Sequence, residues 1–192
     1  MYDAIEDPYC YPGTTVLRNK RNLRIQSELD KFEALMTTER AQEPLPTGRL
    51  DYIHYRAIHR HLFQDVYEWA GRIRTVRMTK DGSPFCYPEN IDREMRKIFG
   101  TLEADNRFRD LTREAFAAKA GRFLADLNAI HPFREGNGRT QTSFLLILAD
   151  QAGHPLDFER LNPGAMLRAM IESFQGDERP LVKLLLQIMR GG

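Results

Sequence analysis

Cysteine is scarce in this sequence of 192 residues, which contains only Cys10 and Cys86. The two are far apart and form no C-x-x-C pair, so neither a disulfide framework nor a cysteine zinc site is indicated. We expect both residues to be ordinary thiols in a reducing compartment.

An excess of charge of either sign is also missing. The 28 lysines and arginines against 27 aspartates and glutamates give a formal net charge of +1, so bulk electrostatics do not indicate nucleic-acid binding. No apolar run approaches the roughly 18 residues of a membrane span. The first residues, Met1-Tyr2-Asp3, lack the basic and apolar regions of a secretory signal peptide. We expect a cytoplasmic protein with no membrane association and no direct nucleic-acid partner.

What the sequence does have is helical periodicity, and its length suits a single domain over residues 1–192. A turn-rich, irregular arm over residues 1–20 is followed by apolar residues at helical spacing, in six or more stretches. These begin near Leu23, run from about Leu50 to Tyr67, and continue over 91–102, 116–130, 140–153 and 181–189. We predict an all-α fold in which the helix over 140–153, apolar on nearly every side, is central in the core.

Cap residues indicate where several of these helices start and stop. Thr112 is a predicted N-cap, and Asn162-Pro163 provide an N-cap and a proline at the first helical position of a later helix. Gly153 is predicted to end the helix over 140–153.

Residues 72–87 interrupt the helical pattern. The segment from Thr75 to Thr79 alternates between polar and apolar residues, Asp81-Gly82 is a turn dipeptide, and Pro84 restricts the returning segment to an edge strand. This pattern predicts one small β-hairpin. Two roles stay open from the residues alone: a decoration packed by Phe85, or an edge that pairs with an extended segment of a partner.

The segment from His131 to Arg139 combines an imidazole, a carboxylate, an amide, a guanidinium and two glycines. It precedes an apolar run, which indicates a loop that turns directly into a helix whose first N–H groups favour anions. Gly136 and Gly138 are expected to allow positive φ and close approach of a ligand. Arg139 suits phosphate oxygens, and Glu135 suits Mg²⁺ shared with phosphates.

His131, with an unperturbed pKa of about 6.5, suits the removal of a proton from a hydroxyl group. Simpler explanations exist for each residue, namely a helix-ending His-Pro, a turn at Asn137-Gly138 and a surface ion pair between Glu135 and Arg139. Taken together, these explanations leave a base, a carboxylate, an anion site and a cation without a purpose.

Other residues near this segment are expected to have structural roles. Phe133 should pack in the core, and Arg134 should face solvent or make a modest phosphate contact. His54, His59 and His61 lie on one predicted helix, but their spacing does not place them on one face. Surface or capping positions are therefore favoured over a metal site for these three.

The segment from His131 to Arg139 resembles the signature of the Fic domain family, H-x-F-x-[D/E]-G-N-G-R-x-x-R. Further stretches are similar to stand-alone bacterial Fic toxins and secreted Fic effectors: Asp7-Pro8-Tyr9, Tyr11-Pro12-Gly13, Leu17-Arg18-Asn19, Ile58 to Gly71 and Pro84-Phe85-Cys86. The resemblance implies a compact Fic fold. It also implies transfer of AMP from ATP, with Mg²⁺, to a Ser, Thr or Tyr hydroxyl of a target protein.

The resemblance assigns roles to particular residues of this chain. The catalytic residues would be His131, Asn137 and Arg139, and Glu135 would hold the metal. The nucleotide would be contacted by Gly136, Asn137, Gly138, Arg139 and Thr142. A hairpin flap over residues 72–87 would dock the target through Val76, Met78, Phe85 and Tyr87.

Thr142 stands where the family pattern has a second arginine, which in the family holds the γ-phosphate and pairs with an inhibitory glutamate. Threonine is short and uncharged, so it replaces neither contact. Weak transfer, a nucleotide-binding module without transfer, or another phosphate-ester donor are therefore alternatives. A misplacement of about 1 Å can cost 10²-fold in rate.

The inhibitory helix that many Fic proteins carry or recruit has the pattern [S/T]-x-x-x-E-[G/N], which has no match in this sequence. The resemblance therefore implies inhibition in trans by a small antitoxin. It also implies a bacterial toxin of the cytoplasm, or an effector if the protein is delivered into a host cell.

Overall fold

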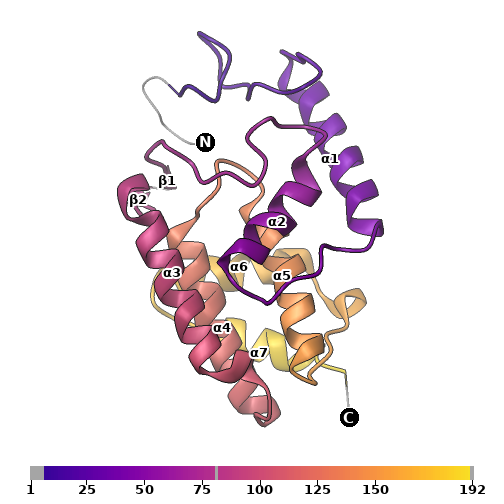
Figure 1. Cartoon of the computed structure of the whole chain (residues 1–192), viewed down its shortest axis with the longest axis vertical. Coiled ribbons are helices and arrows are strands. Elements are labelled where there is room, and N and C mark those ends of the chain that lie inside the picture. The colour runs from indigo at the N-terminus through magenta and orange to yellow at the C-terminus, as the bar shows by residue number, and fades with distance from the viewer. Residues whose placement is uncertain (1–6, 81, 191–192) are drawn as a thin grey trace.

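The computed structural model describes residues 7–80 and 82–190, and within them it confirms an all-α fold with one small β-hairpin (Figure 1). The described elements are, in chain order, α1 (Gln26–Gln42), α2 (Tyr52–Phe63), β1 (Thr79–Lys80), β2 (Ser83–Pro84), α3 (Pro88–Ala104), α4 (Arg113–Ile130), α5 (Asn137–Gln151), α6 (Pro163–Phe174) and α7 (Arg179–Ile188). Two short 3-10 turns lie at Asn106–Phe108 and Phe158–Arg160. Among the described residues, no helix has both the length and the apolar character that crossing a bilayer requires.

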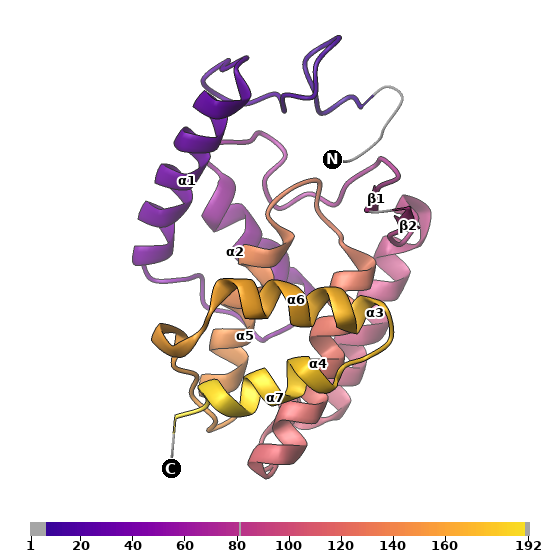
Figure 2. The ribbon, with the colours of Figure 1, turned by 180° about the vertical axis from the view of Figure 1, so that it is seen from behind.

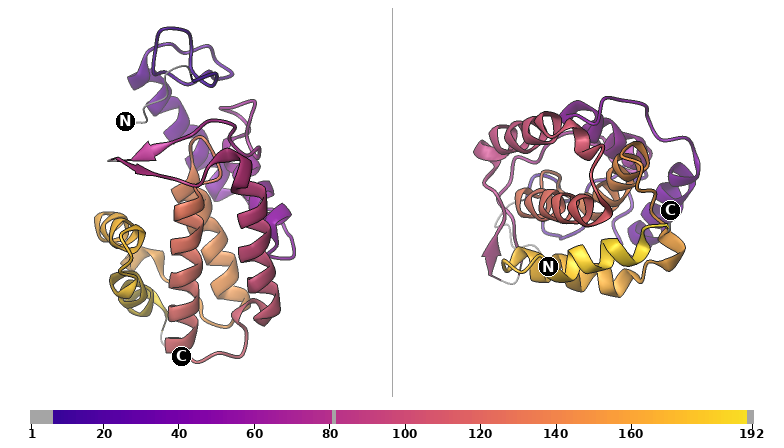
Figure 3. Two further views of the ribbon diagram at one scale, coloured as in Figure 1. Left: turned by 90° about the vertical axis from the view of Figure 1, so that its left-hand side faces the viewer. Right: turned by 90° about the horizontal axis from the view of Figure 1, so that it is seen from below.

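The centre of the bundle is α4, which packs against α3, α5, α6 and α7. These helices surround it in the view from below in Figure 3. Figure 2 shows α6 and α7, which pack on each other, crossing in front of α4 and α5 in this view. The helix predicted over 140–153 is α5, and it packs on α2 and α4. It borders the centre and does not form it, because Leu146 and Ile147 are only half-buried.

The predicted helix caps are confirmed. Thr112 Oγ1 accepts a hydrogen bond from the N–H of Ala115 at 3.3 Å, and Asn162 Oδ1 accepts one from the N–H of Ala165 at 3.0 Å. Gly153 follows the end of α5 with a left-handed φ of 82°. Each of the two N-cap side chains satisfies a backbone N–H that has no partner inside its helix, which is worth about 1 kcal/mol.

The second helix is shorter than predicted. It ends at Phe63 instead of near Tyr67, because the Phe63 carbonyl accepts hydrogen bonds from both Val66 and Tyr67 and closes a turn. The side chains of Val66 and Tyr67 are nevertheless buried. The apolar pattern therefore extends beyond the end of the helix, because side chains can face the core without a helical backbone. This is why the predicted boundary was too late.

Phe133, in the segment between α4 and α5, is fully buried, which confirms its predicted core position. Its ring stacks on Tyr55 and His59 of α2, with ring centroids 5.6 Å and 3.7 Å apart. Tyr55 also contacts Phe144 of α5 at 5.5 Å. Burial of one phenylalanine stabilises a fold by about 1.5–3 kcal/mol, so this ring fixes the segment to the two helices beside it.

The hairpin is smaller than the segment predicted for it. Its strands pair Thr79 with Pro84 and Lys80 with Ser83. The predicted turn dipeptide begins at Asp81, which lies outside the described residues. Residues 72–78 and 85–87 lie outside the paired strands, and they lie beside the end of α4 in the left view of Figure 3.

An irregular arm over residues 7–20 lies across the end of the bundle that carries the hairpin (Figure 1). Cys10 and Leu17 form an isolated antiparallel bridge, and both side chains are buried. The first six residues of the predicted arm lie outside the described residues.

Candidate active site

The loop between α4 and α5, together with the first turns of α5, carries the predicted catalytic, metal-binding and nucleotide-binding residues. Helix α4 ends at Ile130 and is followed by His131, whose backbone is left-handed with φ 49°, and α5 starts after Gly136. The loop is shorter than the predicted 131–139, because residues 137–139 form the first turn of α5. A positive φ in a residue with a side chain costs of order 1–3 kcal/mol, so the surroundings of His131 must hold it in place.

Gly136 and Gly138 have different environments. Gly136 has φ 83°, and a Cβ atom there would lie 2.2 Å from Cζ of Phe63, so only glycine fits. Gly138 has no positive φ, which corrects the expectation of a left-handed backbone at this residue. A Cβ on Gly138 would meet nothing within 4 Å. The space in front of the start of α5 is therefore open on the Gly138 side.

Backbone N–H groups at the start of α5 face this open space. Those of Asn137, Gly138 and Arg139 belong to the first turn, whose donors have no acceptors inside the helix. Together with the helix dipole they favour a bound anion.

The side chain of Asn137 braces the loop, where a direct contact with phosphate was expected. It is only 3% exposed. Its Nδ2 donates to the Phe133 carbonyl at 2.8 Å, and its Oδ1 accepts from the Phe133 N–H at 2.9 Å. Both polar groups of the amide are thus engaged by the backbone of the anchored residue.

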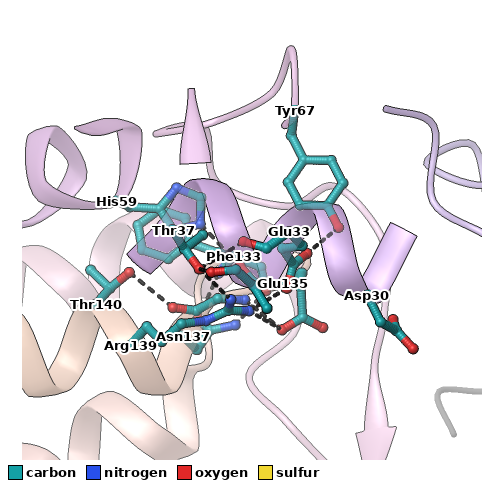
Figure 4. A network of polar contacts seen from close by, with 12 residues as sticks. Asp30, Glu33, Thr37, His59, Tyr67, Phe133, Glu135, Asn137, Arg139 and Thr140 are labelled. Atoms are coloured by element: carbon teal, nitrogen blue, oxygen red, sulfur yellow. Dashed lines mark hydrogen bonds and ion pairs between the residues drawn. The ribbon is translucent and has the colours of Figure 1, made fainter. Parts of the chain in front are cut away.

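Arg139 is held by residues of α1 and by Phe63 of α2, as Figure 4 shows in part. Its Nη2 donates to Glu33 Oε1 at 2.5 Å and its Nη1 donates to Thr37 Oγ1 at 3.1 Å. The guanidinium also lies over the Phe63 ring, 4.6 Å from its centroid. The Tyr67 hydroxyl donates to the other carboxylate oxygen of Glu33. The Arg139 side chain is 40% exposed, so solvent and ligands can still reach it.

Glu33 is a site residue that the sequence prediction missed. It lies on the same face of α1 as Leu29 and Thr37, the two buried residues four positions before and after it. A carboxylate in the middle of a buried helical stripe was the available signal. Its partner Arg139 is 106 positions away in the chain, and no local pattern indicates such a pairing.

Glu135 belongs to the same group of charges. Its Oε1 accepts the N–H of Gly136 at 2.8 Å and lies 3.6 Å from Nη2 of Arg139. Burial, and then the nearby Glu33 carboxylate, raise the pKa of Glu135. When both carboxylates are ionised, they exceed the single positive charge of Arg139 between them.

This excess of hard carboxylate oxygen fits Mg²⁺ shared with phosphates, because Mg²⁺ is usually bound through one or two carboxylates plus phosphates and water. A site made by protein groups alone does not occur in the described part of the chain, which has no cluster of three or more His, Cys, Asp or Glu side chains suited to a metal ion. Glu135 is the residue here that a phosphate-bound metal could reach.

The imidazole of His131 lies against Phe85 of the returning flap segment, with ring centroids 4.0 Å apart and planes inclined by 17°. Burial, and then the positive charge of Arg74, lower the pKa of His131 to about 3, against the opposite effect of a backbone hydrogen bond with Asn128. The ring is therefore neutral at physiological pH, which is the form that accepts a proton.

His59 is fully buried, which corrects the expectation of a surface or capping position. Its Nδ1 accepts the N–H of Gly71 at 2.8 Å, and its Nε2 lies 3.0 Å from the Glu135 carbonyl oxygen. Burial lowers the pKa of His59 to about 3, so the ring is neutral and the proton resides on Nε2, which donates to Glu135. His54 is also buried, and His61 is partly exposed.

Arg134 is buried as well, which corrects the expectation that it faces solvent or phosphate. Its Nε donates to Asp7 Oδ2 at 2.6 Å, and both side chains are 7% exposed. Removing one partner of a buried pair typically costs about 3–5 kcal/mol, because the other charge loses its compensation. The irregular arm is thereby tied to the loop.

Two of the four flap residues expected to meet a target face inward instead. Met78 and Phe85 are 2% and 5% exposed, because they pack beneath the flap. This corrects their assignment as docking side chains. Val76 is half-buried, and Tyr87 is 44% exposed with the Arg77 guanidinium 4.4 Å from its ring centroid.

The chain has clear similarity to known proteins. The model of the Fic/DOC family matches residues 49–149. "Probable protein adenylyltransferase y4lH" of Sinorhizobium fredii is 58% identical over 181 residues, which cover 94% of this chain and 94% of that protein. "Protein adenylyltransferase VbhT" of Bartonella schoenbuchensis is 38% identical over 179 residues, which cover 92% of this chain and 37% of that protein.

A solved structure extends the similarity to three dimensions. BepC of Bartonella tribocorum, a VirB-translocated effector protein crystallised with bound AMPPNP, superposes with a TM-score of 0.84 at 30% sequence identity. The superposition covers 96% of this chain and 97% of that one.

The contrast between the two glycines can be tested by paired substitutions. We expect Gly136→Ala to lower the free energy of unfolding by about 2 kcal/mol or more, because the left-handed backbone costs about 1–2 kcal/mol and the new Cβ must displace Phe63. Gly138→Ala is the matched control and should leave stability unchanged or higher, because alanine is favoured over glycine in helices. Urea unfolding measures both, and equal losses would contradict the geometry.

The two histidines with lowered pKa values predict a loss of stability in acid. His59 and His131 are protonated near pH 6.5 in the unfolded chain but only near pH 3 when folded. Their contribution is complete above about pH 6.5 and falls as the pH drops towards 3, because the unfolded state then binds more protons. Between pH 7 and pH 5 each should cost about 2 kcal/mol. The raised pKa of Glu135 acts in the opposite direction.

Urea unfolding at pH 7 and pH 5 measures this loss, and His131→Asn isolates one histidine. That variant should show a pH-dependent loss smaller by about 2 kcal/mol than the wild type. An unchanged loss would mean that His131 titrates normally in the folded protein.

Proposed function

The chain belongs to the Fic/DOC family, and from this premise we propose that it is a protein adenylyltransferase, which transfers AMP from ATP to a hydroxyl group of a target protein. The observation that carries the proposal is one loop that brings His131, Glu135 and Arg139 to an open helix start. Two relatives whose alignments cover more than nine-tenths of this chain are named as protein adenylyltransferases. The ATP analogue bound to BepC supports ATP as the donor.

In this proposal the start of α5 binds the phosphates of ATP. The N–H groups of its first turn are the donors, and Gly138 leaves the space through which the phosphates approach. Gly136 sets the bend, and Asn137 acts through the loop that it braces. Arg139 pairs with phosphate oxygens, and the phosphates compete with Glu33 for it because Glu33 already neutralises part of its charge.

Glu135 is the residue that we propose holds Mg²⁺. The carboxylate is next to the phosphate-binding N–H groups and has a negative neighbour in Glu33, so a cation beside it relieves repulsion that would otherwise oppose the nucleotide. When bound, the ion would neutralise phosphate charge and help to orient the triphosphate.

His131 acts as the general base in this mechanism. Its neutral ring accepts the proton of a Ser, Thr or Tyr hydroxyl on the target, and the resulting oxygen attacks the α-phosphorus of ATP. The bond from that phosphorus to the bridging oxygen breaks, and pyrophosphate leaves. Once ATP is bound, the negative phosphates raise the pKa of the nearby His131 imidazole towards about 7, which makes the imidazole a stronger base.

The flap would dock the target above His131. The accessible Tyr87 and Val76 are the contacts that remain from the predicted four, while Met78 and Phe85 support the flap from beneath. A hollow of about 320 Å³ lies beside Tyr87, lined by residues 84–87 and by Asn90, Arg93 and Glu94. An extended segment of the target can place a side chain there while its backbone pairs with the flap edge.

We further propose a bacterial toxin or effector that acts in the cytoplasm and is inhibited in trans by a small antitoxin. The sequence contains no inhibitory-helix pattern of its own. BepC, similar over nearly the whole chain, is a translocated effector.

Thr142 favours two alternative functions: a weakly active or inactive nucleotide-binding module, and a transferase with another phosphate-ester donor. The residue lies one turn after Arg139 on α5 and is half-buried. It offers a hydroxyl where a second cation would hold the far end of a triphosphate. A donor with fewer phosphates would lose less by this replacement.

We expect His131→Ala to lower AMP transfer by about 10²–10⁴-fold, below detection, while ATP affinity stays within about twofold. The phosphates are held by α5, so binding does not depend on the imidazole. Transfer is measured with Mg²⁺, α-labelled ATP and a bacterial lysate, and affinity by calorimetry. His61→Ala, at a partly exposed histidine of α2, is the control and should label normally. Normal labelling of the target by His131→Ala would show that His131 is not the general base.

We expect Thr142→Arg to raise ATP affinity by about tenfold, because a charge-assisted hydrogen bond contributes about 1.5–3 kcal/mol before the cost of ordering the side chain. Ser143→Arg adds the same charge one position further round α5 and should have a smaller effect. Label that appears only with Thr142→Arg would support the nucleotide-binding module. Label with both the wild type and Thr142→Arg supports transfer as the natural activity.

A further inference from the structure

The carbonyl groups of residues 129–132, at the end of α4, all accept hydrogen bonds from the flap segment. The Cys86 N–H donates to the Ala129 carbonyl at 3.1 Å, and the Arg74 N–H donates to the Pro132 carbonyl at 2.9 Å. Between these two, the guanidinium of Arg74 donates to the carbonyls of Ile130 and His131 at 3.2 Å and 2.8 Å. The last carbonyl groups of a helix have no N–H donors within the helix. The flap supplies donors to these carbonyls at the end of α4.

The same guanidinium joins the two arms of the flap. Its Nη1 donates to the Val76 carbonyl on the outgoing arm, and its Nη2 donates to the Cys86 carbonyl on the returning arm, both at 2.6 Å. Arg74 is 2% exposed. A positive charge is favoured at the C-terminal end of a helix, and a shorter or apolar side chain would leave buried carbonyls without donors.

His131 is the residue that this arrangement fixes. Its carbonyl accepts from Nε of Arg74, and its left-handed backbone needs such support. Its ring is covered by Phe85, which directly precedes the Cys86 carbonyl held by the same guanidinium. One buried side chain therefore sets the flap, the end of α4 and the imidazole relative to one another.

We propose that Arg74 is a positioning residue for transfer, because it fixes the flap at the distance from His131 that brings a docked hydroxyl to the base. The inference rests on the proposed function and deepens it. The phosphate-binding start of α5 is held by other residues, through the bonds of Asn137 to Phe133 and of His59 to Glu135. Loss of Arg74 should therefore impair transfer more than nucleotide binding.

Three variants test this inference: Arg74→Met, Arg74→Lys and, as control, Arg72→Met at an exposed position of the same segment. With Arg74→Met we expect at least about a 100-fold loss of transfer at saturating ATP, with ATP affinity within about threefold. Arg74→Lys keeps the charge but has no planar fork, so it should recover part of the rate. Arg72→Met should transfer AMP at the wild-type rate.

Hydrogen exchange gives a readout that does not depend on catalysis. In Arg74→Met, and less in Arg74→Lys, exchange should accelerate at the Phe85 and Cys86 amides, which bond to Met78 and Ala129, but not in the first turns of α5. If the wild type transfers no AMP, the proposed function is wrong. Independently of that result, unchanged hydrogen exchange at the Phe85 and Cys86 amides in these variants would overturn the role of Arg74. The role of Arg74 would also be overturned if Arg74→Met transferred AMP at the wild-type rate, or if it lost transfer and ATP affinity equally.

Discussion

The burial of Phe133 against the aromatic face of α2 is the interaction on which the site depends. The ring lies between Tyr55 and His59, and the backbone of the same residue is bonded twice to the side chain of Asn137. Two polar bonds and one buried ring thus fix the loop from both sides. With the loop fixed, α5 can begin only after the bend at Gly136, where Phe63 leaves no room for a Cβ atom. The open helix start is a result of this packing.

Charge is distributed around the site in a way that suits a reaction on phosphates. Buried histidines stay neutral, so neither His59 nor His131 adds positive charge. When both are ionised, the carboxylates of Glu33 and Glu135 together outweigh the positive charge of Arg139. Under the proposed function, this balance would favour a nucleotide that arrives with a metal ion over a bare nucleotide.

The sequence allowed the helices, three of their ends and the position of the loop to be predicted, because those features depend on residues close together in the chain. Phe133 could be placed in the core for the same reason. The partners of Arg139 and Arg134 could not be predicted, since Glu33 and Asp7 lie 106 and 127 positions away. His59 was misassigned because helical spacing shows which face a residue occupies, but not which loop covers that face. Met78 and Phe85 were assigned to target docking from the family resemblance, because the residues alone do not show which side of so short a hairpin meets the domain.

The ion pairs that join the amino-terminal arm and α1 to the site determine where the boundary of this domain should be placed. The family match begins at residue 49, after α1 and the arm. A fragment cut at that boundary would retain every residue of the signature, yet it would lack Asp7, the ion-pair partner of the buried Arg134, and Glu33, the ion-pair partner of Arg139 on α1. Grafting the signature onto another scaffold meets the same obstacle. The smallest portable unit therefore includes about fifty residues that carry none of the signature.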